Sequence, residues 1–153
     1  MYPHDAQLGG AYCRSIRSTQ PVNTPTLYRR MTTNTQALNN LAQFTGGENY
    51  HRHLGMQYTD GIQFLAQNAD CYWLLDCITS YQPALCQNPR LFDFQLWELK
   101  VSDHSSFSSA VLTCTDGDNE LPVITQQIQS TDFLLPQIQL YVERGVVLLP
   151  SEH

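Results

Sequence analysis

The residues best suited to chemistry begin with a pair of histidines, His51 and His53. Alternate side chains of a strand point to the same face, so a strand here would place both imidazoles side by side. They could hold a metal ion such as Zn²⁺ if Asp60, Cys71 or Asp76 supplied further ligands. The chain has neither an HExxH motif nor a Cys/His finger, so histidines at the surface or core edge are the favoured alternative, and we expect no cofactor.

Asp76 is the second candidate because it lies in the largely apolar run YWLLDCI. A buried carboxylate must be paired or protonated, and Arg52 is the predicted partner, in an ion pair that fixes residues 48–58 against a helix. Alternatively, Asp76 acts as a base or ligand in a pocket with His53 and Tyr72. If Arg52 were left buried, Asp76→Ala would destabilise the fold by several kcal/mol.

Together these arguments define a candidate pocket or buried network: Arg52, His53, Asp60, Tyr72, Trp73 and Asp76. Asp60 also has a simpler predicted role as the N-cap of a helix, with Gln63 as its partner in a capping box. Trp73 and Trp97 suit a core, although an exposed tryptophan beside Tyr72 would mark an interface.

No other motif specifies a reaction. The acidic turn TDGDNE lacks the EF-hand order of acids and glycine, so a hairpin turn is favoured over a calcium site. No Ser/His/Asp order, glycine-rich phosphate loop or dinucleotide fingerprint occurs. The chemistry-bearing residues therefore favour a protein without catalytic activity.

The element that must position these residues is the apolar stretch 59–81. Ile62, Leu65 and Ala66 recur at the spacing of one helix face, and Leu74 and Ile78 repeat the pattern further on. We expect two helical pieces or one bent helix, ending before the proline at position 83.

Beyond position 92 the hydrophobic period changes from 3.6 to 2, which predicts strands at 92–101, 109–115 and 121–129. A last helix is expected to begin near Pro136 and to end at Gly145, followed by a short strand at 146–149. With a helix after position 33, this order predicts an α+β domain: an antiparallel sheet of three to four strands with helices packed on one face.

Charge divides the 153 residues into two parts. Residues 1–30 hold four arginines and one aspartate and little hydrophobic periodicity, which indicates a poorly structured arm, or an upstream extension if Met31 is the initiator. Residues 31–153 form the single predicted domain, with four basic and thirteen acidic residues and a net charge of −9. Such a domain is unsuited to general nucleic-acid binding, whereas a basic protein partner fits it.

The cysteines are odd in number and widely spaced: Cys13, Cys71, Cys77, Cys86 and Cys114. This pattern favours reduced thiols over a disulfide framework. No apolar run has the length of a signal peptide or a membrane span, so a cytoplasmic location without membrane association is expected.

Several motifs together resemble a small bacterial family of unknown function. They are FTGGENYHRH, YTDGIQFLAQNADCYWLLDCI, FQLWEL, LTCTDG and DFLLPQIQLYVERGVVLLPSE, and the resemblance covers residues 34–153. The chain departs from the pattern at Cys71 and Cys77, where small residues are expected. The resemblance implies an origin in bacteria, often cyanobacteria, on mobile or phage-associated DNA, but it implies no activity.

The leading functional hypothesis is a small acidic protein-interaction module acting on a protein of the host or of the mobile element. One alternative is a small metal-dependent hydrolase centred on His51, His53, Asp60 and Asp76. A DNA mimic that inhibits a nuclease or repressor is another, although the acids are scattered along the chain. A homo-oligomeric structural component is the last.

Overall fold

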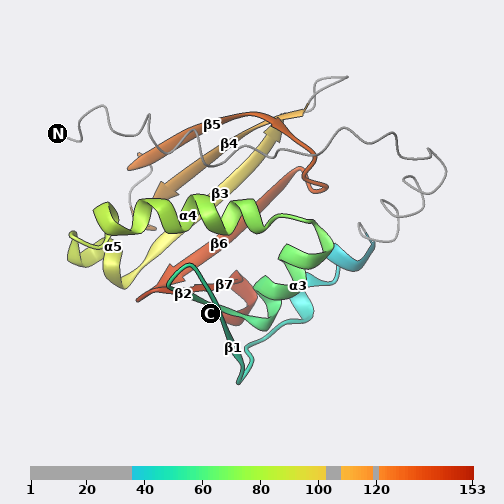
Figure 1. The fold of residues 1–153 in the computed structure, drawn as a ribbon, viewed down its shortest axis with the longest axis horizontal. Helices are drawn as coiled ribbons and strands as arrows, with labels where there is room; N and C mark the ends of the chain where they lie inside the picture. Colours follow the sequence, from blue (N-terminus) through green and yellow to red (C-terminus); the bar gives the residue numbers. More distant parts are fainter. Residues whose placement is uncertain (1–35, 103–107, 119–120) are drawn as a thin grey trace.

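A single β-sheet organises the chain in the computed structural model, which describes residues 36–102, 108–118 and 121–153. The described strands form one seven-stranded sheet, in which they lie side by side in the order β1-β2-β7-β6-β3-β4-β5 (Figure 1). The strands are β1 (Tyr50–His53), β2 (Met56–Thr59), β3 (Gln95–Ser102), β4 (Ser108–Thr115), β5 (Ile124–Thr131), β6 (Gln137–Glu143) and β7 (Val146–Leu148). The helices are α3 (Asp60–Asn68), α4 (Tyr72–Leu85) and α5 (Pro89–Asp93), with short 3₁₀ turns η1 (Leu41–Gln43) and η2 (Pro150–Glu152).

The predicted sheet of three to four antiparallel strands is wrong. The sheet is mixed, because β2 pairs in parallel with β7 while the other strand pairs are antiparallel. The broad α+β class fits, since the helices and the strands occupy separate stretches of the chain.

The largest local error is strand β6, for which the sequence predicted a helix. The segment QIQLYVE can be interpreted with either period, since Ile138 and Val142 lie on one helix face and Ile138, Leu140 and Val142 also alternate. The three alternating residues are buried in the structure. β6 lies between β3 and β7, so the pairing of its backbone on both sides decides for the strand.

Gly145, predicted to end that helix, instead forms a tight hairpin turn. Arg144 and Gly145 have φ of 48° and 85°, and Glu143 pairs directly with Val146. Positive φ at both central residues is the mark of a type I′ two-residue turn, which matches the twist of the flanking strands. Leu54 and Gly55, at 47° and 87°, join β1 to β2 in the same way.

Helices α3 and α4 confirm the prediction of two helical pieces. The break falls at Asp70, whose φ of 50° cannot continue a right-handed helix. α4 does not end before Pro83, as predicted, but runs on to Leu85 with the proline inside its last turn.

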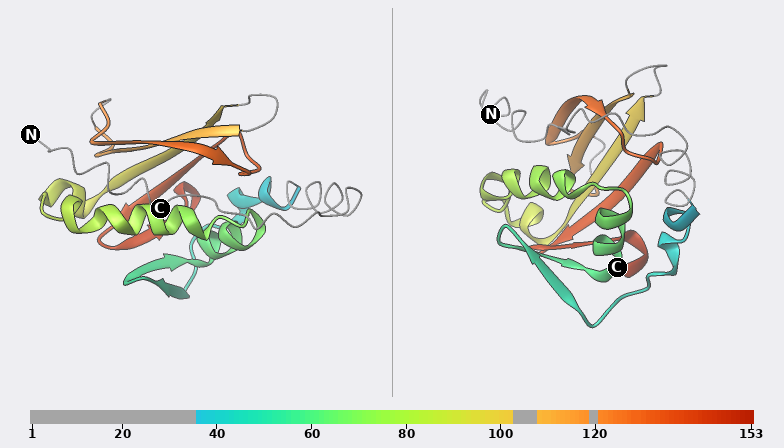
Figure 2. Two further views of the ribbon diagram at one scale, coloured as in Figure 1. Left: turned by 45° about the horizontal axis from the view of Figure 1, so that its top comes forward. Right: turned by 45° about the vertical axis from the view of Figure 1, so that its right-hand side comes forward.

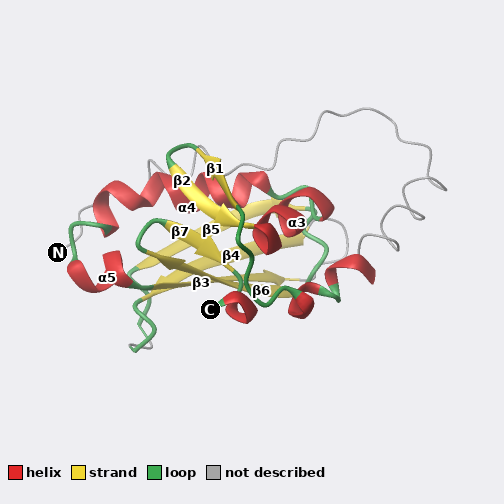
Figure 3. Ribbon diagram, turned by 90° about the horizontal axis from the view of Figure 1, so that it is seen from below, coloured by secondary structure: helices red, strands yellow, loops and turns green. Residues whose placement is uncertain are grey.

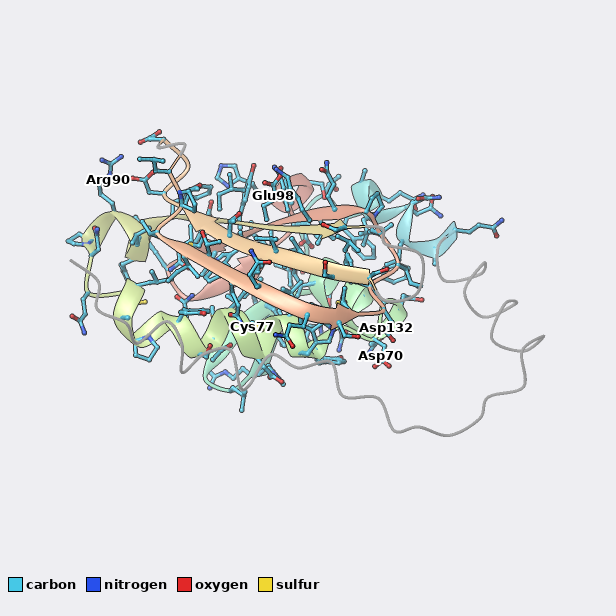
Figure 4. All side chains as sticks on the ribbon, turned by 90° about the horizontal axis from the view of Figure 1, so that it is seen from above. Asp70, Cys77, Arg90, Glu98 and Asp132 are labelled. Carbon is cyan, nitrogen blue, oxygen red and sulfur yellow. The ribbon has the colours of Figure 1, made fainter. Side chains whose placement is uncertain are left out.

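Within the described ranges, the sheet has one face covered by α4 and an opposite face, which we call the open face (Figure 2). α4 lies along one side of the strands (Figure 2), and its inward side and the facing strand residues form the core. Figure 4 shows Cys77 between α4 and the sheet and Glu98 on the opposite side. Along β3, buried Trp97 and Leu99 alternate with Leu96 and Glu98, which are partly exposed.

A buried pair of glutamines joins α4 to the sheet, and no pattern in the sequence predicts it. Gln82 and Gln95 exchange amide hydrogen bonds of 2.9 and 3.0 Å between their side chains. Gln95 also accepts from the Trp97 indole at 2.8 Å and donates to the Leu91 carbonyl at 2.8 Å. The amide of Gln95 is therefore fully satisfied at a position that is only 1% exposed.

Three of the four described cysteines, Cys71, Cys86 and Cys114, are free thiols, but the prediction of reduced thiols throughout the chain is wrong, because Cys77 is disulfide-bonded. Burial raises the pKa of Cys71 and that of Cys114 to about 12, so both thiols stay protonated near neutral pH. Within the described ranges, every helix is too short or too polar to cross a bilayer.

Candidate functional site

Two His–Asp pairs lie side by side where the β1–β2 hairpin meets the first turns of α3 and α4. His51 Nε2 is 2.7 Å from Asp60 Oδ1, and His53 Nε2 is 2.5 Å from Asp76 Oδ1. The two imidazoles are two residues apart on one strand, a separation of about 7 Å along the backbone. All four side chains are partly exposed, between 28% and 38%. A dissolved ligand can therefore reach both pairs.

Two tyrosines connect the pairs. Tyr58 stacks on the ring of His51 with centroids 5.3 Å apart, and Tyr72 contacts the ring of His53 at 5.8 Å. Burial raises the pKa of Tyr58, and the hydroxyl of Tyr72, hydrogen-bonded to it, raises this pKa further. Tyr58 thus remains neutral at physiological pH, and the two tyrosines together bridge the two pairs. We call these six residues the histidine cluster: His51, His53, Tyr58, Asp60, Tyr72 and Asp76.

The folding of the hairpin explains why the cluster forms. The tight turn at Leu54 and Gly55 sets the register His51 to Tyr58, and alternation turns His51, His53 and Tyr58 to the helix side of the sheet. α3 follows β2 without a loop, which brings Asp60 beside the hairpin. Figure 3 shows the hairpin lying next to α3 and α4.

Asp60 is held as a carboxylate. The His51 imidazole hydrogen-bonded to it lowers the pKa of this carboxyl below its ordinary value of 3.8. The amide of Asn49 donates a further bond of 3.3 Å to the other oxygen, which lowers the pKa in the same direction. A charged acceptor is therefore present at this point of the surface throughout the neutral range.

Arg52 does not pair with Asp76, contrary to the prediction. It lies between the two histidines on β1, and the same alternation that turns the histidines inward turns Arg52 to the open face, where it is exposed. Within the described ranges it makes no salt bridge. Asp76 is 38% exposed and not buried as expected, and His53 is its partner.

This exposure changes the expected effect of Asp76→Ala. A partly exposed ion pair is screened by water, so we expect a loss of about 1 kcal/mol or less in the free energy of unfolding. Urea unfolding measures the loss, with Asp93→Ala as a control, since Asp93 pairs with Arg144 at a more exposed site. A loss of several kcal/mol would show instead that the pair is structural.

Asp60 is not the N-cap of α3, and the predicted capping box with Gln63 is absent from this helix. Thr59 is the N-cap and Asp60 the first helical residue. The free backbone N–H of Gly61 donates to Glu152 Oε1 at 3.1 Å. The capping carboxylate thus comes from the far end of the chain, a position that local sequence patterns cannot reveal.

The remaining predicted residue, Trp73, packs against the core beside the histidine cluster. Its indole nitrogen is buried and has no hydrogen-bond acceptor among the described residues. Trp97 is fully buried in the core, which confirms the prediction of a core residue over that of an exposed interface residue.

The metal hypothesis requires a third ligand near the histidines. Among the described residues, no group of three or more His, Cys, Asp or Glu side chains is placed to hold a metal ion. In the acidic turn after β4, Asp116 and Asp118 both lie within 4 Å of Arg90, at 3.5 and 2.7 Å.

The open face carries a shallow depression that the sequence did not indicate. Its volume is about 270 Å³, and it lies over the ends of β1, β2, β6 and β7. Its lining includes Tyr50, Thr59, Glu143 and His153, and the last two are joined by a contact of 2.5 Å. Only the three-dimensional arrangement brings these residues together.

Fold and site together define a small α+β domain with one seven-stranded mixed sheet and a polar cluster at its hairpin end. The chain belongs to the Family of unknown function (DUF6876), whose sequence model matches residues 35–153. This agrees with the resemblance seen in the motifs, which covered nearly the same residues. No curated protein and no solved structure matches the chain.

Proposed function

We propose that the domain is a small protein-interaction module without catalytic activity and that its histidine cluster binds basic side chains of a partner protein. The observation that carries the proposal is the pair of accessible carboxylates, Asp60 and Asp76. Each is oriented by an imidazole, and aromatic rings lie beside both imidazoles. Carboxylates and aromatic faces are the groups that recognise arginine and lysine.

The charge of the domain supports a basic partner. The described residues include four basic and eleven acidic side chains. Arg90, Lys100 and Arg144 each already contact a carboxylate, which leaves acidic groups in excess over the rest of the surface. Such a field attracts a basic partner and speeds the encounter with it.

Binding to a hexa-arginine peptide at low and moderate salt tests the proposal. The double variant Asp60→Asn/Asp76→Asn keeps the shape of the cluster and removes two charges, so we expect its affinity to fall about tenfold. Asp93→Asn/Asp118→Asn removes the same charge elsewhere and is expected to change the affinity much less. Equal losses in the two variants would reduce the binding to general electrostatic attraction and refute a specific site.

A small hydrolase centred on His51, His53, Asp60 and Asp76 is the second candidate. It is favoured by the geometry of His53 and Asp76, because an imidazole oriented by a carboxylate is a common acid–base pair. A metal-dependent form would need ligands beyond those that the described residues bring together. Elemental analysis of the purified protein tests that form, with His51→Ala/His53→Ala as the comparison. Metal-free protein and an unchanged double variant would contradict it.

The resemblance adds a proposal about origin: a bacterial protein, often cyanobacterial, encoded on mobile or phage-associated DNA, whose partner belongs to the host or to the element. A cytoplasmic location is proposed with it: the free thiols of Cys71, Cys86 and Cys114 support a reducing compartment, whereas the disulfide of Cys77 favours an oxidising one. The genes adjacent to the coding sequence test the origin, and fractionation of the native cells tests the location.

A further inference from the structure

We infer that the basic partner binds as an extended segment, which adds an antiparallel strand to the outer edge of β1 and carries one acidic residue between two basic ones. The inference rests on the proposed function and adds the conformation and the sequence pattern of the partner. β1 is one of the two edges of the sheet and pairs, within the described ranges, only with β2. Strand addition to such an edge is a common mode of peptide recognition.

The register of the β1–β2 hairpin shows which backbone groups of β1 face outward. His53 pairs with Met56 directly beside the two-residue turn, and such a pair exchanges both of its hydrogen bonds. The bonding direction alternates along the strand, so the N–H and C=O of Arg52 point away from β2. The N–H of Gln57, opposite Arg52, donates to the Gly145 carbonyl at 3.1 Å, on the side of β7, which agrees with this direction.

Arg52 therefore fixes the register of an added strand. The central residue of that strand hydrogen-bonds to the Arg52 backbone, and its two neighbours lie opposite His51 and His53. Residues directly opposite each other on neighbouring strands point their side chains to the same face. The two neighbours thus lie on the helix side, at the histidine cluster, and the central residue lies on the open face beside Arg52.

The two faces of β1 carry charges of opposite sign. On the helix side, the Asp60 and Asp76 carboxylates lie 2.7 and 2.5 Å from the imidazole Nε2 atoms. Arginine has the length and the planar set of N–H groups to bond a carboxylate from a neighbouring strand. On the open face, the exposed Arg52 makes no salt bridge within the described ranges. The order basic, acidic, basic complements all three positions.

Exposed apolar side chains at both ends of β1 support its use as an interface. Of the four large hydrophobic side chains exposed among the described residues, Tyr50 begins β1 and Leu54 directly follows it. Apolar groups of this kind gather where proteins meet. β1 itself has only four residues, and the charge of Arg52 disfavours pairing with an unrelated edge, so complementary side chains select the partner.

Two peptides of equal composition and charge test the pattern. One has the core Thr-Arg-Glu-Arg-Thr and the other the core Thr-Arg-Arg-Glu-Thr, both with acetylated and amidated ends. No register of the second peptide places both arginines at the histidine cluster and the glutamate beside Arg52. NMR titration of the full chain at low salt should therefore show that the first peptide binds about fivefold tighter or more. Equal affinities would overturn the inference.

Reversing the charge at the centre of the edge gives a matched test. Arg52→Glu should lower the affinity for the Arg-Glu-Arg peptide about tenfold relative to that for a peptide with the core Thr-Arg-Arg-Arg-Thr. Lys100→Glu makes the same change of charge at an exposed position of β3, away from the hairpin, and should leave this ratio nearly unchanged. A ratio that shifts equally in the two variants would overturn the predicted register.

Two further results separate this inference from the proposed function. Strand addition pairs the Arg52 amide, so its hydrogen exchange should slow about fivefold or more at saturation with the first peptide, and unchanged exchange would refute strand addition. If both peptides bind equally and both lose affinity in Asp60→Asn/Asp76→Asn, the register is refuted while the proposed function stands. If neither peptide binds, or if neither affinity responds to that double variant, both proposals are refuted.

Discussion

Replacing Gln95 with leucine is expected to lower the free energy of unfolding by about 3 kcal/mol. Leucine fills most of the same space, so the loss comes from hydrogen bonds rather than from a cavity. The Trp97 indole N–H loses its acceptor, and the Gln82 side chain loses both of its bonds to Gln95. Each polar group left unsatisfied in the core costs about 1–3 kcal/mol.

Urea unfolding followed by tryptophan fluorescence measures this effect. Gln139→Leu is the matched control, because Gln139 is exposed and its amide makes one bond of 3.2 Å to Glu98. The control should stay within about 0.5 kcal/mol of the wild type. A Gln95→Leu protein as stable as this control would mean that the glutamine pair does not contribute to the stability of the core.

The second large effect is expected at Glu152, where alanine should lower the free energy of unfolding by about 2 kcal/mol. The carboxylate accepts from the Gly61 and Leu149 backbone N–H groups at 3.1 and 3.0 Å and from the Thr59 hydroxyl at 2.5 Å. It also lies at the N-terminal end of α3, where the helix dipole favours a negative charge.

The first turn of α3 is closely packed, so no other group nearby can take the place of the Glu152 carboxylate. A Cβ on Gly61 would lie 2.7 Å from the Leu149 side chain and 2.8 Å from the Glu152 carboxyl. Leu149 and Glu152 therefore pack directly onto the first turn of α3. Thermal unfolding of Glu152→Ala tests the prediction, with Glu48→Ala, an exposed acid of the loop before β1, as the control. Equal melting temperatures for the two variants would contradict it.

The sequence could predict the elements whose periodicity is unambiguous. The two helical pieces, β3, β4 and β5 all lie near their predicted positions, because each shows one clear hydrophobic period. The prediction of a helix at β6 was wrong because the residues of this segment suit both the helical and the strand period. Only the pairing with its two neighbours in the sheet decides for the strand. β6 is one of the three strands that the predicted sheet lacked, and β1 and β2 are the other two.

Part of the candidate site could be predicted from the alternation of side chains along a strand. Two histidines at alternate positions of a strand must share a face, so His51 and His53 could be identified without the structure. The same rule, applied to Arg52, places it on the other face, yet the predicted pairing with Asp76 overlooked this. Glu152 lies 91 residues from its backbone partner Gly61, beyond any local pattern.

The central claim is that the histidine cluster is the binding site for basic groups, and NMR titration with a hexa-arginine peptide tests it most directly. We predict that the chemical shifts of His51, His53, Asp60, Tyr72 and Asp76 change with a common saturation curve. The signals of Asp93, Asp116 and Asp118 should change little. Shifts concentrated at those distant acids, with an unchanged histidine cluster, would contradict the claim.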